Sequence, residues 1–156
     1  MILTPEKIIE DLKKQFIRKG GFYMNNEEAR EWMTVADSDL DSAKILNSAA
    51  HKHCEIICYH CAQAAEKYLK GYLVYNDLDT QKTHNLLFLN NLCAEKDKMF
   101  EDIITECEFL NKFATDIRYP HKYEVTEDDV TYAIKAVEKI KKCKPLLNCI
   151  NNISEY

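Results

Sequence analysis

An arginine and a histidine stand close together at one predicted helix end, in the run Arg118-Tyr119-Pro120-His121. The residue before a proline disfavours helical geometry, so we expect the preceding helix to end at this point. His121 then follows the helix end, where its ring can face solvent or a substrate. Arginine binds phosphate through two hydrogen bonds and stabilises developing negative charge, and histidine transfers protons near neutral pH. The pair therefore suits cleavage of a phosphodiester with the ribose 2′-hydroxyl as internal nucleophile.

A structural role for Arg118 is the alternative. Arg118 continues the helical stripe of Asn111, Ala114 and Ile117, which points its side chain toward a neighbouring helix. Asp39 lies on another apolar stripe, and a buried carboxylate needs a partner. The sequence therefore also fits a salt bridge between Arg118 and Asp39 inside a helical bundle, beside a histidine at the surface.

Metal and nucleophile sites are less well supported. Cys54, Cys58 and Cys61 have a spacing that iron–sulfur proteins also use. They share one helical face with Ile57 and Leu69, however, and free cysteine commonly packs as a small hydrophobe. A carboxylate-bridged di-metal bundle needs Glu three residues before His, and none of the five histidines has one. No Gly-flanked serine or phosphate-binding glycine loop occurs either, so we expect no metal and no cofactor.

Five lysines make the last long helical segment basic: Lys135, Lys139, Lys141, Lys142 and Lys144. Cations near a helix C-terminus interact favourably with the helix dipole, so a solvated face is one interpretation. A local contact surface for phosphates is the other.

Hydrophobic periodicity predicts helices throughout and no strands. The expected segments run from Thr4-Pro5 to Gly20-Gly21, and then over about 25–46, 54–75, 85–94, 100–117 and from Thr126 toward Pro145. Gly71 in the middle of a helix lowers helix propensity and indicates close contact between helices. We therefore predict an all-α, up-and-down bundle of four to five helices at 25–147, with a short N-terminal helical appendage at 1–24 and a polar tail at 148–156.

The totals fit a single globular domain. The chain has 156 residues, three Gly, three Pro and a formal net charge of −5, which argues against binding of polyanions through bulk charge. The first residues lack an apolar signal segment, and no stretch is long and apolar enough to span a membrane. We read the seven cysteines as reduced thiols of a cytoplasmic protein.

Four ordered blocks of the sequence resemble the HEPN domain (higher eukaryotes and prokaryotes nucleotide-binding). They lie at 32–43 (Trp32 to Ala43), 61–71 (Cys61-Ala62-Gln63-Ala64-Ala65-Glu66-Lys67-Tyr68-Leu69-Lys70-Gly71), 83–86 (Thr83-His84-Asn85-Leu86) and 110–120 (Leu110 to Pro120). The resemblance covers about Glu27 to Cys143 and implies a helical bundle that commonly forms a homodimer.

Many HEPN relatives are metal-independent ribonucleases, including toxins of toxin–antitoxin pairs, in which Arg and His from both subunits form one cleft. The resemblance thus implies catalytic roles for Arg118 and His121, with Arg118, Tyr119, His84, Lys67 and Lys70 binding nucleotide or RNA. Catalytic relatives place more residues between Arg and His than the Tyr119-Pro120 pair found here. Other relatives are non-catalytic interaction modules, which frequently pair with a small nucleotidyltransferase encoded by the adjacent gene. A module of this kind is the alternative function.

Overall fold

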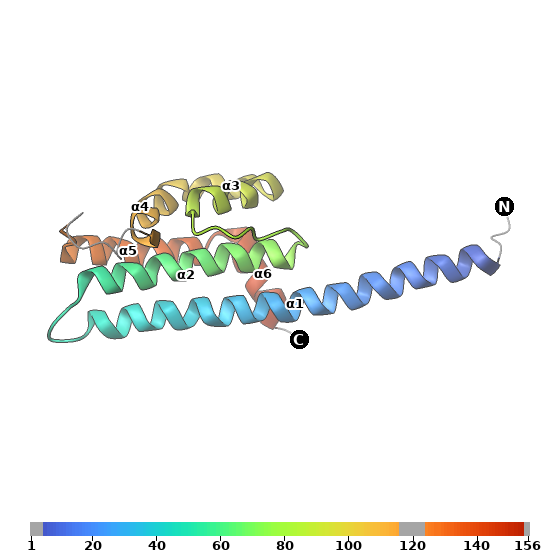
Figure 1. Cartoon of the computed structure of the whole chain (residues 1–156), viewed down its shortest axis with the longest axis horizontal. Coiled ribbons are helices and arrows are strands. Elements are labelled where there is room, and N and C mark those ends of the chain that lie inside the picture. Colours follow the sequence, from blue (N-terminus) through green and yellow to red (C-terminus); the bar gives the residue numbers. More distant parts are fainter. Residues whose placement is uncertain (1–4, 116–123, 155–156) are drawn as a thin grey trace.

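Helices make up all the regular structure in the described part of the chain. A computed structural model describes residues 5–115 and 124–154, and within residues 5–24 it describes only the backbone and the side chain of Lys7. The elements are α1 (Pro5–Asn47), α2 (Cys54–Tyr75), α3 (Leu86–Lys96), the short 3₁₀ helix η1 (Lys98–Ile103), α4 (Ile104–Thr115), α5 (Glu127–Lys141) and α6 (Lys144–Ser154). Helices α1 and α2 pack as an antiparallel pair, with α3 and α4 on the opposite side of α2 (Figure 1). The predicted all-α bundle is confirmed.

The first helix differs from the prediction. Helix α1 continues through Gly20 and Gly21 for 43 residues, so the expected break there and the separate short N-terminal helix are wrong. Glycine lowers helix propensity by about 1 kcal/mol but does not forbid helical dihedrals, and no proline follows to stop the helix. The N-terminal half of α1 extends well beyond the other helices (Figure 1).

The C-terminal segment differs as well. The predicted polar tail at 148–156 is wrong as far as Ser154, because residues 144–154 form α6 with Leu146, Cys149 and Ile153 buried. Pro145 lies in the first turn, where its missing N–H is not needed for a helical hydrogen bond. The Arg30 Nη2 atom donates to the carbonyl of Ile153 at 2.8 Å and ties the end of α6 to α1.

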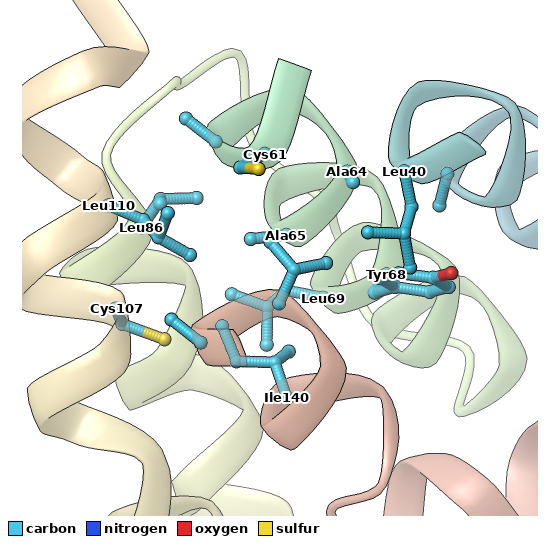
Figure 2. Close-up of a cluster of buried hydrophobic side chains, with 14 of the residues drawn as sticks. Leu40, Cys61, Ala64, Ala65, Tyr68, Leu69, Leu86, Cys107, Leu110 and Ile140 are labelled. Atoms are coloured by element: carbon cyan, nitrogen blue, oxygen red, sulfur yellow. The ribbon is translucent and has the colours of Figure 1, made fainter. Parts of the chain in front are cut away.

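The core is arranged around α2, which packs on α1, α3, α4, α5 and α6. Small side chains Ala64 and Ala65 let neighbouring helices approach, and Leu69 fills the space toward α5 (Figure 2). Cys61 lies in this apolar cluster as predicted, Cys107 lies there too, and burial raises the pKa of each thiol to about 12. Protonated thiols of this kind pack as small hydrophobic groups.

Gly71 marks a close approach of α1 and α2. A Cβ atom added at Gly71 would lie 2.8 Å from Met33 Cε and 3.1 Å from Trp32 Cβ. The expected close helix contact is therefore confirmed. Within the described residues, no helix is both long enough and apolar enough to cross a membrane.

Candidate functional site

The predicted catalytic segment lies outside the described residues. Arg118, Tyr119 and His121 all fall in 116–123, between the end of α4 and Glu124. After this segment Thr126 begins α5 with a capping box, in which Thr126 and Asp129 bond each other's backbone N–H. Lys52, in the loop between α1 and α2, pairs with Glu127 at 2.8 Å. The first turn of α5 therefore lies beside the α1–α2 loop.

Asp39 is the predicted buried carboxylate, and α2 supplies its partners. The Nζ atom of Lys67 forms an ion pair with Oδ2 of Asp39, and Nδ1 of His60 lies 3.0 Å from Oδ1. The Asp39 side chain is 14% exposed, so it needed partners of this kind. His60 and Lys67 are seven residues apart, which places them on one face of α2. The predicted pairing of Asp39 with Arg118 involves a residue outside the described part and stays a prediction.

Glu66 holds a second group of charges on the same helix. Its Oε1 atom accepts from Lys70 Nζ at 2.8 Å, and Nδ1 of His84 lies 3.1 Å from Oε2. The Glu66 and Lys70 side chains are only 5% and 9% exposed, whereas the His84 side chain is 61% exposed. The ammonium of Lys70 also lies 5.6 Å from the ring centre of Trp32 in α1, close enough for a cation–π interaction.

The segment Thr83-His84-Asn85-Leu86 brings His84 to Glu66. Thr83 Oγ1 accepts from the N–H of Asn85, and the Asn85 side chain caps α3 by accepting from Phe88 N. Leu86 is buried, and its N–H donates to the Asn111 side chain of α4 at 2.8 Å. These local bonds fix the loop before α3, so the histidine position follows from the fold.

We name the residues Asp39, His60, Glu66, Lys67, Lys70 and His84 the paired-charge face. A carboxylate bonded to Nδ1 of a histidine orients the imidazole ring and leaves Nε2 available for a ligand or a proton. His84 meets this description because its ring is largely exposed. Lys67 and Lys70 are already bonded to carboxylates, so a phosphate would have to compete with Asp39 and Glu66 for them. Their predicted role as direct ligands stays a prediction.

Sequence reasoning did not find Glu66 as the anchor of this face. A signal was present, because Glu66 and Lys70 have the i,i+4 spacing of a helical ion pair. The contact with His84 spans 18 residues and a loop, so no local pattern indicates it.

The lysines of α5 and of the residues just after it, as far as the start of α6, divide into two groups. Lys139 bonds Glu106 of α4 at 2.7 Å, and Lys141 bonds Asp37 of α1. Lys135, Lys142 and Lys144 are exposed, and the described residues include no carboxylate within salt-bridge distance of any of them. Among the described side chains, no three His, Cys, Asp or Glu residues are placed to share a metal ion.

Comparisons with known proteins give a consistent result. A crystal structure of an archaeal HEPN homologue superimposes with a TM-score of 0.58 at 25% sequence identity, covering 81% of this chain and 95% of that one. No curated protein matches the sequence closely enough to count as a relative. The sequence profile of the HEPN domain matches residues 29–147, which include both the paired-charge face and α5. The chain therefore belongs to the HEPN domain family.

Proposed function

We propose that this HEPN protein binds RNA or nucleotide phosphates through Arg118, Tyr119, His121 and His84, and that it cleaves RNA without a metal, as a toxin–antitoxin-type ribonuclease. The observation that best supports a chemical role is the His84 imidazole. The buried Glu66 carboxylate contacts its Nδ1 atom, and the ring is 61% exposed. A histidine held in this way can bind a phosphate oxygen or transfer a proton with its free nitrogen.

The proposed reaction needs a base, an acid and a cation that stabilises charge. His121 removes the proton from the ribose 2′-hydroxyl, the 2′-oxygen attacks phosphorus, and the bond to the 5′-oxygen breaks. The 5′-oxygen leaves with a proton from a second acid, for which an imidazolium of the other subunit of a homodimer is the proposed donor. Arg118 stabilises the negative charge that develops on the phosphoryl oxygens. The products are a 2′,3′-cyclic phosphate and a 5′-hydroxyl.

Arg118→Ala tests this proposal. We expect cleavage of single-stranded RNA to fall by about 100-fold or more, as when one preorganised charge-stabilising group is removed. Product ends are identified by mass spectrometry, in buffer with a metal chelator. Arg18→Ala removes the same charge and should retain activity. An RNA whose riboses carry 2′-methoxy groups should resist cleavage. Wild-type protein that leaves every RNA intact after removal of any bound partner would overturn the catalytic proposal.

The second candidate is a non-catalytic module that pairs with a nucleotidyltransferase-like protein. The net charge of −5 and the prior engagement of Lys67 and Lys70 by carboxylates support it, because both weaken attraction for RNA. Size-exclusion chromatography with light scattering tests it on the protein alone and with the neighbouring gene product. A stable complex together with no ribonuclease activity supports this candidate. A homodimer that cleaves RNA and binds no such partner contradicts it.

A further inference from the structure

A groove between η1 and the end of α5 has no role in the proposed reaction. It encloses about 500 Å³ and is lined by Met99, Asp102, Ile103, Lys135, Glu138, Lys139, Lys142, Cys143 and Lys144. That volume falls in the usual range for small-ligand sites. We name it the lysine groove.

The cations of the lysine groove are unequal in availability. Lys139 is bonded to Glu106, and the acidic Glu138 is bonded to Lys44 at 2.9 Å. These pairs leave Lys135, Lys142 and Lys144 against Asp102, an excess of positive charge in a chain whose total charge is negative. Cations that have no carboxylate partner among the described side chains and gather in one concave site raise the local concentration of anions.

The spacing of these lysines indicates the shape of the anion. Residues 135, 139 and 142 follow the i, i+4, i+7 pattern and lie on one side of α5. Lys135 and Lys142 are separated by about 10 Å along the helix at 1.5 Å per residue. One phosphate would contact both ammonium groups only if the two side chains bent toward each other, whereas a chain of linked phosphates can contact both while the side chains stay extended.

The groove also has an apolar part. Met99 is 41% exposed, and Ile103 and Cys143 lie beside it in the lining. An apolar surface next to cations can hold a base attached to a phosphate chain, so the phosphate chain could be free or part of a nucleoside triphosphate.

We propose that the lysine groove binds a polyphosphate group, either as a free chain or within a nucleoside triphosphate. The site differs from the Arg118 segment. Lys135 and Lys142 lie nine and sixteen residues beyond Thr126, which is about 14 and 24 Å along the helix axis from the end at which that segment connects. The proposal does not depend on RNA cleavage.

Calorimetric titration of the whole protein with tripolyphosphate, ATP and inorganic phosphate tests the groove, in low-salt buffer without divalent cations. We expect tripolyphosphate and ATP to bind clearly more tightly than inorganic phosphate, and the affinity to fall as salt rises. Lys135→Ala/Lys142→Ala should weaken tripolyphosphate binding by about tenfold or more, as when charge-assisted hydrogen bonds are lost. Asp102→Asn should strengthen it several-fold, because a like charge leaves the site.

The matched control is Lys82→Ala/Lys96→Ala, which removes the same two charges from exposed positions outside the groove. Its tripolyphosphate affinity should stay within about twofold of wild type. Equal weakening in both double variants, or no binding of tripolyphosphate and ATP to wild type, would overturn the proposal.

If ATP binds more tightly than tripolyphosphate and Met99→Ala removes the difference, the ligand is a nucleotide. Equal affinities identify the phosphate chain. Arg118→Ala should leave all these affinities unchanged, which separates this site from the proposed ribonuclease site.

Discussion

The paired-charge face and the lysine groove each contain several charged side chains, but the two regions differ in how far these side chains are buried and paired. On the paired-charge face, Glu66 and Lys70 are almost fully buried and bonded to each other. In the lysine groove, Lys135 and Lys142 are exposed and have no carboxylate partner among the described side chains. The first region resembles a piece of polar core, and the second resembles an exposed, hydrated surface.

The difference follows from the cost of removing charge from water. A buried ion is tolerated when a partner and hydrogen bonds compensate it, and removal of one partner is then strongly destabilising. An exposed lysine stays hydrated, contributes little to stability and remains available to an anion. Substitutions on the paired-charge face should therefore change folding stability, and substitutions in the groove should change binding.

Glu66→Ala should have the largest effect. The substitution leaves the Lys70 ammonium buried without its carboxylate and releases His84, so we expect a loss of about 3–5 kcal/mol in the free energy of unfolding. Urea denaturation measures the loss. Glu138→Ala is the control, since that carboxylate is 38% exposed and pairs with an exposed lysine, and it should cost under about 1 kcal/mol. Similar losses for the two variants would show that burial does not distinguish the regions.

The paired-charge face also shows what the sequence could predict. Apolar periodicity was enough for the helical bundle and for the inward position of Cys61, because both depend on local spacing. The need of Asp39 for a partner followed from its place on an apolar stripe. The sequence did not identify these partners. His60 and Lys67 belong to another helix, and their contact with Asp39 depends on how α1 and α2 pack.

Two predicted helix boundaries were wrong, also because the sequence was interpreted locally. The sequence predicts a helix end at Gly20 and Gly21, but glycine only lowers helix propensity and α1 runs through both. The sequence predicts a polar tail from Asn148 onward, although its three asparagines alternate with three apolar residues, Cys149, Ile150 and Ile153. Leu146, Cys149 and Ile153 nevertheless fall on one face and bury themselves against the bundle, since three apolar contacts at helical spacing suffice when a core is adjacent.

Gly71→Ala, at the contact between α1 and α2, should have an intermediate effect on stability. The added methyl group would meet Met33 Cε at 2.8 Å and Trp32 Cβ at 3.1 Å. Methionine can move, but the tryptophan Cβ is fixed to the α1 backbone, so the helices must separate slightly. We expect overpacking to exceed the gain of about 1 kcal/mol in helix propensity, with a net loss of about 1 kcal/mol.

Gly20→Ala serves as the control for that measurement. Gly20 is also helical, so alanine should be neutral or stabilising by up to about 1 kcal/mol in the same urea titration. Stabilisation by both substitutions would contradict the close approach of α1 and α2 at Gly71.

Lys141 and Lys142 give the smallest and most selective comparison, because they are adjacent in sequence and belong to the two different environments. Lys141 is about one-third exposed, bonds Asp37 and lies 5.7 Å from the ring centre of Tyr68. Lys141→Ala should therefore lower the free energy of unfolding by about 0.5–1 kcal/mol, whereas Lys142→Ala should change it by less than about 0.5 kcal/mol. Tripolyphosphate titration should reverse the order, with weaker binding for Lys142→Ala and unchanged binding for Lys141→Ala. If the same variant loses both stability and binding, the separation between structural and ligand-binding charge fails on this helix.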